Sequence, residues 1–231
     1  MQGNVSAVRV EDLWKIYKSG SQEVLALRGL SMQVVPGQFT ALKGRSGSGK
    51  TTLLNCLSGL DEPTTGKVFI FGKDLSEMNE SQKTHWRSQE LGLIFQSFGL
   101  IPTLSAYENI EIILRLSGVK ARERRLRTRE CLDLVGLTKW SDHRPFEMSG
   151  GQQQRVAVAR SIANRPQLIL ADEPTGELDT TTAREILSLF RKIVDEQDVT
   201  LLMTSHDPVV DDFVDEIMHL HDGKLVEMEP A

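Results

Sequence analysis

The sequence carries one glycine-rich run that fixes local chain geometry, Gly44-Arg45-Ser46-Gly47-Ser48-Gly49-Lys50-Thr51. It fits the pattern G-x-x-x-x-G-K-[ST], in which glycines let successive backbone N–H groups turn toward one point. The apolar segment Gln38–Lys43 before it has the pattern of a strand, and Lys50–Ser58 has the pattern of a helix. A strand, a glycine-rich loop and a helix in this order predict an α/β core.

This run has the chemistry of a phosphate-binding loop. The N-terminus of the following helix adds partial positive charge to the converging N–H groups. We expect Lys50 to neutralise the β- and γ-phosphates of a nucleotide and the Thr51 hydroxyl to ligate Mg²⁺. The predicted nucleotide-binding residues are Gly44, Arg45, Ser46, Gly47, Ser48, Gly49, Lys50, Thr51 and Thr52. The alternative is a glycine-rich turn that only connects a strand to a helix.

Charged side chains follow two further predicted strands. The run Leu168–Ala171 is continuously apolar, as in a strand covered on both faces, and it ends in Asp172 and Glu173. Because ligands of open α/β sheets collect at the carboxyl ends of strands, we expect Asp172 to hold Mg²⁺ and Glu173 to act as general base on a water. The alternative is a pair of solvated carboxylates. His206 follows the predicted strand Val199–Thr204, so we expect it at the same edge, near Glu173 and the γ-phosphate.

The remaining pattern alternates strands with helices. Strands are predicted at Ala7–Trp14, Leu30–Val35, Lys67–Phe71, Leu91–Phe95 and Glu216–His221, and helices at Ala106–Ser117, Ala121–Val135, Gly150–Ala163 and Thr181–Glu196. Pro36-Gly37 and Asp222-Gly223 are interpreted as hairpin turns. No Pro- or Gly-rich linker sets off the helical stretch at about residues 97–163. We therefore predict one domain over residues 1–231, with an inserted helical subdomain between the core segments at about 1–96 and 164–231.

A further run lies between the phosphate loop and Asp172, and it reads Met148-Ser149-Gly150-Gly151-Gln152-Gln153-Gln154-Arg155. It resembles the signature sequence of ATP-binding-cassette (ABC) ATPases, and the resemblance covers essentially the whole chain. It implies the P-loop NTPase fold of ABC ATPases, with an N-terminal antiparallel β subdomain and an inserted helical subdomain. It also implies ATP and Mg²⁺ as cofactors and hydrolysis of ATP to ADP and phosphate.

The resemblance implies roles for individual residues. Tyr17 would stack on adenine, although Trp14 lies close to it in sequence and is the competing aromatic residue. Gln96 would touch Mg²⁺, sense the γ-phosphate and take part in catalysis. His206 would be the switch histidine, and Asp179 would cross a dimer interface. Ser149, Gly150, Gly151 and Gln152 would bind ATP held by the opposite subunit, and they also precede a predicted helix, as a phosphate-binding N-terminus does.

Three segments narrow the resemblance to one subfamily of these ATPases, namely Asn55–Asp61, Phe95–Ser105 and His143–Pro145. They resemble the subfamily of macrolide exporters, lipoprotein-releasing complexes, antimicrobial-peptide resistance transporters and a cell-division ATPase. This implies a homodimer that closes on two MgATP and drives a transmembrane permease on a separate chain, at the cytoplasmic face of the inner membrane. The alternative is a non-transport process, such as cell-wall remodelling or cell division, driven through a membrane partner.

Composition limits other classes of function. A net charge of −5, with 27 Lys and Arg against 32 Asp and Glu, argues against a nucleic-acid-binding surface. DNA-repair and translation members of the family usually carry a coiled-coil insertion or a second cassette, and the sequence has neither. No run reaches the roughly 18 apolar residues of a membrane span, so we expect any membrane role to depend on a partner. Cys56 and Cys131 are predicted to be buried apolar residues.

Two segments suggest contact surfaces. Phe98–Pro102 is apolar for a loop, and it either docks a membrane partner or packs inside the helical subdomain. Lys120–Glu130 holds six basic and two acidic residues. It forms either a solvated helix face or a surface attracted to anionic lipid.

Overall fold

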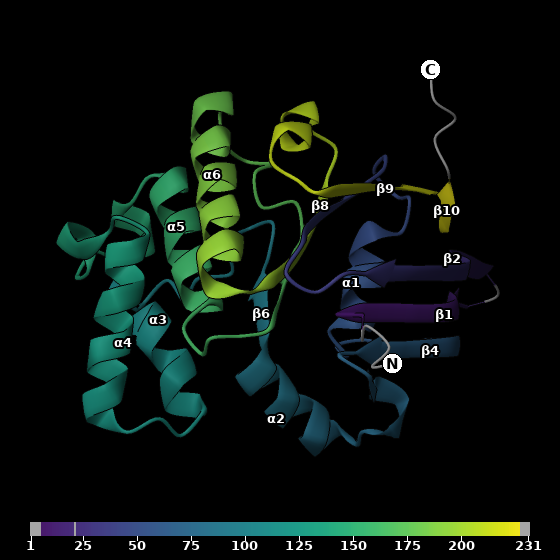
Figure 1. The fold of residues 1–231 in the computed structure, drawn as a ribbon, viewed down its shortest axis with the longest axis horizontal. Coiled ribbons are helices and arrows are strands. Elements are labelled where there is room, and N and C mark those ends of the chain that lie inside the picture. Colours follow the sequence, from purple (N-terminus) through teal and green to yellow (C-terminus); the bar gives the residue numbers. More distant parts are fainter. Residues whose placement is uncertain (1–5, 21, 227–231) are drawn as a thin grey trace.

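The computed structural model describes residues 6–20 and 22–226, which form two sheets with helices between and beside them (Figure 1). The first sheet is antiparallel, with strand order β2-β1-β4-β5. The second has the order β10-β9-β3-β8-β7-β6, and all of its strand pairs are parallel except β9 with β10. This arrangement confirms the predicted mixed α/β fold with an antiparallel N-terminal sheet.

The strands are β1 (Val8–Ser19), β2 (Gln22–Val34), β3 (Phe39–Lys43), β4 (Thr65–Ile70), β5 (Lys73–Asp74), β6 (Leu91–Ile94), β7 (Leu168–Ala171), β8 (Thr200–Ser205), β9 (Glu216–His221) and β10 (Lys224–Val226). The helices are α1 (Lys50–Leu57), α2 (Glu80–Glu90), α3 (Ala106–Leu116), α4 (Ala121–Leu134), α5 (Gly150–Ser161) and α6 (Thr180–Gln197). Single-turn 3₁₀ helices occupy Leu75–Glu77, Thr138–Trp140 and Pro145–Glu147, and a slightly longer one occupies Pro208–Asp212.

The parallel sheet separates two hydrophobic cores, because successive strand residues point to opposite faces. In β7, Leu168 and Leu170 pack in the core shared with α1 and the antiparallel sheet. Ile169 and Ala171 pack in the core shared with α3, α4, α5 and α6. Figure 1 shows the strands between these two groups of elements. Since β7 is covered on both faces, its continuous apolar run is explained, and its carboxyl end is held rigidly.

The structure corrects the predicted turn at Pro36-Gly37. This turn does not close a hairpin, because β2 before it pairs in the antiparallel sheet and β3 after it pairs in the parallel sheet. Turn composition predicts a change of chain direction, but not which sheet the next strand joins. The turn at Asp222-Gly223 does join an antiparallel pair, β9 and β10, as predicted.

Helix α2 and the first half of β2 lie outside the predicted elements. Along α2 only Lys83 and Trp86 are buried, so the apolar periodicity that signals a helix is absent. Its one sequence signal is the capping box of Asn79 and Gln82, whose side chains each bond the other's backbone N–H. The first half of β2 is largely exposed, and it continues the ladder with β1 beyond the core.

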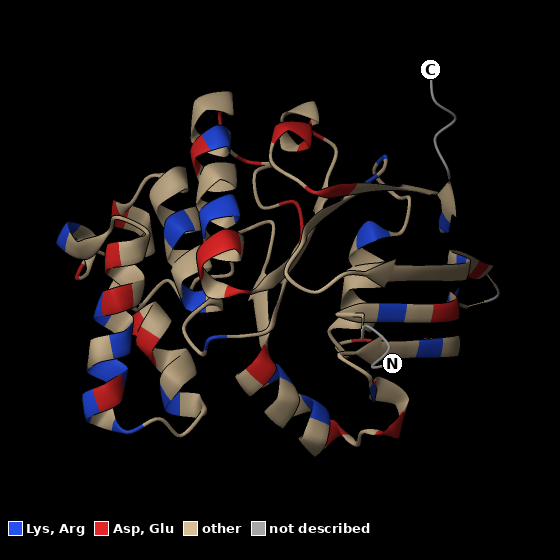
Figure 2. Cartoon of the chain, viewed as in Figure 1, with Lys and Arg blue, Asp and Glu red and all other residues tan. Residues whose placement is uncertain are grey.

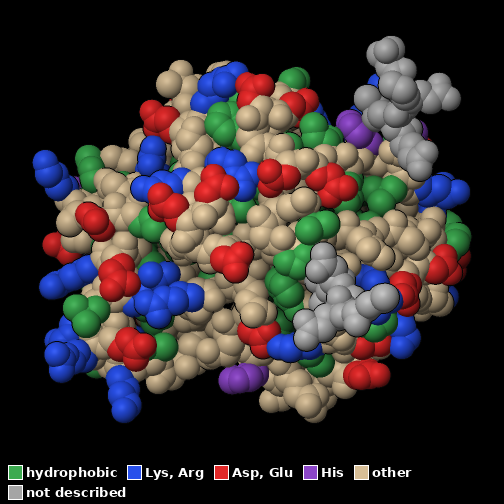
Figure 3. Space-filling model, in the orientation of Figure 1, with side chains coloured by type: hydrophobic (Ala, Val, Ile, Leu, Met, Phe, Trp, Pro, Cys, Tyr) green, Lys and Arg blue, Asp and Glu red, His purple; other side chains and the backbone are tan. Residues whose placement is uncertain are grey.

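The basic segment predicted at Lys120–Glu130 coincides with much of α4. Figure 2 shows basic and acidic residues alternating along this helix. Arg124 forms an ion pair with Glu111 of α3, and Arg127 with Glu130. On the face drawn in Figure 3, charged side chains of both signs are interspersed. These contacts favour the solvated helix face over a lipid-binding surface.

Within the described ranges, every helix is too short or too polar to cross a bilayer. Cys56 and Cys131 are buried and unbonded to each other, as predicted. Burial raises the pKa of the Cys56 thiol to about 12 and that of the Cys131 thiol to about 11. Both thiols therefore stay protonated at neutral pH and serve as core residues.

Candidate functional site

The glycine-rich loop leaves the end of β3 and enters α1, where it makes a tight backbone cradle. A Cβ at Gly44 would lie 2.4 Å from the Leu220 carbonyl oxygen, so no other residue fits there. Gly49, the N-cap of α1, has φ 107°, which is a glycine conformation, and α1 has no side-chain cap. The Ser48 hydroxyl is buried without a hydrogen-bond partner among the described residues. Uncapped N–H groups and an unpaired buried hydroxyl at one loop fit an anionic ligand such as phosphate.

The Lys50 side chain extends from the first turn of α1 to the backbone of the phosphate loop. Its side chain is only 5% exposed. Its Nζ donates hydrogen bonds to the carbonyl oxygens of Gly44 (2.8 Å) and Arg45 (3.3 Å), and it lies 3.1 Å from Glu173 Oε1. The lysine therefore links the phosphate loop to the carboxylate at the end of β7.

The two acidic residues after β7 are both bonded to one hydroxyl from the neighbouring strand β8. Thr204 Oγ1 donates to Asp172 Oδ1 (2.7 Å) and accepts from the backbone N–H of Glu173 (2.9 Å). Thr204 thus fixes both residues, and sequence reasoning missed it. The available signal was a hydroxyl residue at the end of the predicted strand Val199–Thr204.

Glu173 also contacts His206, which follows β8. His206 Nδ1 lies 3.0 Å from Glu173 Oε2, and the other carboxylate oxygen, Oε1, contacts Lys50. The Glu173 side chain is therefore held from both sides. The sheet edge brings Lys50, Glu173 and His206 together, as the strand order predicts.

The backbone of Glu173 is left-handed, with φ 43°. Because a side chain makes this conformation costly, we expect Glu173→Gly to have a free energy of unfolding about 1 kcal/mol higher than Glu173→Ala. Both variants lose the contacts with Lys50 and His206, so their difference isolates the backbone. Urea denaturation of the two variants measures it. Equal unfolding free energies would contradict a strained backbone at this position.

A cavity of about 820 Å³ opens over these groups. This volume is typical of a site for a nucleotide-sized ligand. The lining residues are Tyr17, Val24, Leu25, Ala26, Arg45, Ser46, Gly47, Gly49, Lys50, Thr51, Thr52, Gln96, Glu173 and His206. The cavity therefore joins Tyr17, most of the phosphate loop and the start of α1 with the predicted catalytic residues Gln96, Glu173 and His206.

One end of the cavity offers an apolar surface for a base. Tyr17 of β1 is 38% exposed and pairs in the β-ladder with Val24, beside Leu25 of β2. Trp14 does not line the cavity, and its Nε1 donates to Asp12 Oδ1 (3.1 Å) instead. Of the two candidate aromatic residues, Tyr17 is the one in position to stack on a base.

The predicted Mg²⁺ ligands offer hard oxygen donors. Thr51 and Gln96 line the cavity, and Asp172 lies beside Glu173 with its Oδ1 bonded to Thr204. A hydroxyl, an amide oxygen and one carboxylate suit Mg²⁺, which takes its other ligands from water and phosphate. In the described part of the chain, no group of three or more His, Cys, Asp or Glu side chains could hold a metal. The residues present therefore fit Mg²⁺ only together with a phosphate ligand.

The signature run lies apart from this cavity. Ser149 is the N-cap of α5, and its capping box with Gln152 joins Ser149 N to Gln152 Oε1 (2.9 Å) and Gln152 N to Ser149 Oγ (3.3 Å). A Cβ at Gly151 would lie 2.5 Å from Thr182 Cγ2 of α6. Asp179 caps α6 by accepting from the N–H groups of Thr181 and Thr182. No residue of 149–152, nor Asp179, lines the cavity of the same chain.

A second cavity, of about 370 Å³, lies between α2, β6, α3 and α5. Three exposed apolar side chains line it, namely Leu60, Phe95 and Leu116, with exposed fractions of 51%, 41% and 75%. The predicted docking run 98–102 does not line it. Phe98 and Leu100 pack on the helical core, and Arg160 holds the loop there by donating to the Phe98 carbonyl oxygen (3.0 Å). The loop after β6 therefore contributes Phe95 to this apolar groove, and the predicted docking run 98–102 lies outside it.

Known proteins share this sequence and fold. The family model described as ABC transporter matches residues 27–176. The chain is 42% identical to the macrolide export ATP-binding/permease protein MacB of Syntrophobacter fumaroxidans, over 94% of this chain and 31% of that protein. It is 41% identical to the lipoprotein-releasing system ATP-binding protein LolD of Chromohalobacter salexigens, over 97% and 94%.

A solved structure has the same architecture over nearly its full length. It is the dimeric post-hydrolysis state of the ATP-binding cassette MJ0796, from Methanocaldococcus jannaschii, bound to ADP and Pi. The TM-score is 0.89 at 38% identity, and the match covers 96% of this chain and 97% of that one. The fold implied by the signature resemblance is confirmed.

Proposed function

Since the chain belongs to the ABC transporter family and is an ATPase of that family, we propose that it powers a complex with a separate transmembrane permease. The observation that carries the proposal is the position of two neighbouring residues after β6. Phe95 lines the apolar groove and Gln96 lines the nucleotide cavity. A partner bound in the groove would therefore contact Phe95, and the next residue in the chain, Gln96, lines the nucleotide cavity.

The cavity supports a direct mechanism of hydrolysis. Lys50 balances the charge of the β- and γ-phosphates, held by the loop N–H groups. Thr51, Asp172 and Gln96 would hold Mg²⁺, which supplies charge neutralisation at the phosphate oxygens when bound. Glu173 accepts a proton from the attacking water. At the same time the water oxygen bonds to the γ-phosphorus, and the bond from the γ-phosphorus to the β–γ bridging oxygen breaks, so that ADP leaves with that oxygen. ADP and phosphate are the products.

Two further groups would assist Glu173. His206 contacts one carboxylate oxygen and orients it toward the water position. Thr204 fixes the backbone from which the carboxylate projects. Together they hold the general base in one geometry before the reaction, which lowers the cost of reaching the transition state.

We propose that two copies complete each other's sites. The N-terminus of α5, with Ser149, Gly150 and Gly151, suits phosphate but does not line the cavity of its own chain. A head-to-tail pair would place it, with Asp179, against the ATP of the other copy. The related cassette MJ0796, described as dimeric and bound to ADP and Pi, supports this arrangement.

We propose that the complex lies at the cytoplasmic face of the inner membrane. The relatives named for macrolide export and lipoprotein release favour export or lipoprotein release as its task. Antimicrobial-peptide resistance is the third task that the resemblance of the sequence implies. The alternative is a process without transport, such as cell-wall remodelling or cell division, driven through a membrane partner. The membrane partner would decide between them.

The groove gives a test of this proposal. Tagged protein carrying Glu173→Gln, with ATP, is pulled down from detergent-solubilised membranes, with and without Leu116→Asp. Because an unpaired carboxylate would enter an apolar contact, we expect Leu116→Asp to reduce the co-purified membrane protein at least about tenfold. Leu126→Asp, at an exposed leucine of α4 outside the groove, is the matched control and should have no effect. The span count of the co-purified protein would identify the type of permease.

Two outcomes would contradict the proposal. Recovery of only soluble or nucleic-acid partners would exclude the membrane complex. Equal recovery with Leu116→Asp and Leu126→Asp would exclude the groove as the docking surface, and this outcome would not bear on the identification of the chain as an ATPase.

A further inference from the structure

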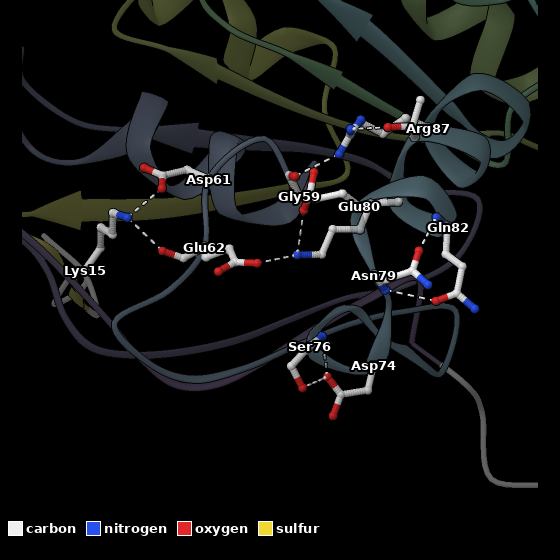
Figure 4. A network of polar contacts seen from close by, with 12 residues as sticks. Lys15, Gly59, Asp61, Glu62, Asp74, Ser76, Asn79, Glu80, Gln82 and Arg87 are labelled. Atoms are coloured by element: carbon white, nitrogen blue, oxygen red, sulfur yellow. Dashed lines mark hydrogen bonds and ion pairs between the residues drawn. The ribbon is translucent and has the colours of Figure 1, made fainter.

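A polar network surrounds the loop that follows α1, and its centre is Asp61. The Tyr17 hydroxyl donates to Asp61 Oδ2 (2.6 Å), and Lys15 Nζ donates to Asp61 Oδ1 (2.5 Å). Both carboxylate oxygens are therefore occupied by partners from β1. Figure 4 shows Lys15 reaching toward Asp61 and Glu62. None of these contacts is used by the phosphate cradle or the general base.

Lys15 contacts the ring of Tyr17 as well as its hydroxyl partner. Lys15 Nζ lies 4.8 Å from the ring centroid, and it also donates to the Glu62 carbonyl oxygen (2.7 Å). Lys15 and Tyr17 are two residues apart on β1, so their side chains leave the same face of the strand. The ring is thus covered by an ammonium group and held at its hydroxyl, which leaves it one orientation.

The loop that carries Asp61 is itself fixed. The backbone N–H groups of Leu60 and Asp61 donate to the Asn55 carbonyl oxygen at 3.0 and 3.1 Å. Lys83 of α2 pairs with Glu62 Oε1 (2.7 Å). Arg87 Nη1 donates to the Gly59 carbonyl oxygen (2.8 Å), as Figure 4 shows. The position of Asp61 is therefore set by α1 and α2 together.

The same helix connects this loop to the phosphate cradle. Helix α1 begins at Lys50 and ends at Leu57, a rigid rod about 12 Å long. Asp61 follows the C-terminus of α1 and accepts the hydrogen bond of Tyr17. The N-terminus of α1 faces the expected phosphate position. The distance between the aromatic ring and the phosphate cradle is therefore fixed by one helix.

The charges of the network are balanced at neutral pH. Burial and the hydrogen bond to Asp61 raise the pKa of Tyr17 to about 12, so the phenol keeps its proton and donates. Burial opposes ionisation of Asp61, but the hydrogen bonds from Lys15 and Tyr17 outweigh it and hold the pKa of this carboxyl below its usual range. The Lys15 and Asp61 charges offset each other, which leaves an uncharged aromatic surface suited to a neutral base.

We propose that Asp61, together with Lys15, is a positioning residue for the nucleotide base. It holds the Tyr17 ring so that the base stacks on its cavity side, beside Val24 and Leu25. This inference rests on the proposed function, in which Tyr17 binds the base of ATP. Without Asp61 the ring would have to be immobilised when the nucleotide binds, and that cost would appear as weaker affinity.

Isothermal titration of purified full-length protein with ATP and with inorganic tripolyphosphate tests the proposal. We expect Asp61→Ala to raise the Kd for ATP and the KM about five- to tenfold, because the Tyr17 ring must then be ordered on binding. The Kd for tripolyphosphate, which has no base, and kcat at saturating ATP should not change. Tyr17→Phe removes the hydrogen bond to Asp61 from the other side, so the double variant should bind ATP no more weakly than Asp61→Ala alone.

Asp74→Ala is the matched control. Asp74 lies in the same part of the molecule, bonds Lys67 (2.8 Å) and the Ser76 hydroxyl (2.7 Å), and does not line the nucleotide cavity. Its replacement should change neither Kd, which excludes a general effect of losing a buried carboxylate. Equal weakening of ATP and tripolyphosphate by Asp61→Ala would overturn the inference, as would unchanged ATP affinity. If the wild-type protein failed to bind ATP, the proposed function would fail instead.

Discussion

Replacing Glu173 with Gln is expected to lower the rate of ATP hydrolysis by roughly 10²- to 10⁴-fold while ATP binding is retained. The amide has the shape of the carboxylate and can still contact His206 and Lys50, but it cannot take the proton of the attacking water. Single-turnover release of phosphate at saturating MgATP measures the rate, and titration with ATP measures binding. The effect is confined to the chemical step because the phosphate cradle is unchanged.

The variant Glu123→Gln is the control for this experiment. Glu123 is exposed on α4 and does not line the nucleotide cavity, so loss of its charge should leave the rate within about twofold of wild type. A Glu173→Gln protein that hydrolysed ATP near the wild-type rate would remove Glu173 as general base. We also expect Glu173→Gln with ATP to elute as a dimer in size-exclusion chromatography, since bound nucleotide is not consumed.

Lys50→Ala is expected to abolish hydrolysis through loss of nucleotide binding, with the Kd for ATP raised about 100-fold. The Lys50 ammonium is buried, and hydrogen bonds between charged groups contribute about 1.5–3 kcal/mol each. Its removal deletes the charge opposite the phosphates and two bonds to the loop carbonyls of Gly44 and Arg45. Isothermal titration with ATP and ADP measures the loss, and the melting temperature shows whether the fold survives.

Lys43→Ala is the matched control for Lys50→Ala. Lys43 lies at the end of β3, immediately before the loop, and pairs with Asp211 (2.7 Å) outside the cavity. We expect its replacement to leave the Kd for ATP within about twofold. If Lys50→Ala bound ATP within about threefold of wild type, the assignment of Lys50 to the phosphates would be wrong.

The hydrophobic pattern within a segment was enough to predict strands that are covered evenly along their length. The strands β7 and β9 begin and end where they were predicted. In β7 four consecutive buried apolar residues mark the strand. Helix α2 was missed because its exposed surface carries no apolar periodicity. The turn at Pro36-Gly37 was misinterpreted because the partner of β3 is β8, more than 150 residues later, and no local signal specifies it.

The residues of the candidate site also fall into those that the sequence could predict and those that it could not. The cradle, Asp172, Glu173 and His206 could be predicted because each lies directly at the end of a predicted strand. Thr204 also lies at the end of a predicted strand, but its bond to Asp172 and the bond of Asp61 to Tyr17 could not be predicted, because they join residues that are remote in sequence. The bond from Tyr17 to Asp61 joins residues 44 positions apart, and the bond from Thr204 to Asp172 joins residues 32 apart. Contacts of this kind depend on the assembled sheets.

Selection acts in two directions at position 173. The left-handed backbone there favours glycine on conformational grounds, yet the sequence keeps a glutamate. A glycine there would relieve about 1 kcal/mol of backbone strain, but it would also leave the buried Lys50 and the neighbouring His206 without their carboxylate partner. In a lineage released from selection for turnover, these two contacts would still favour a carboxylate at position 173 while the backbone favoured glycine.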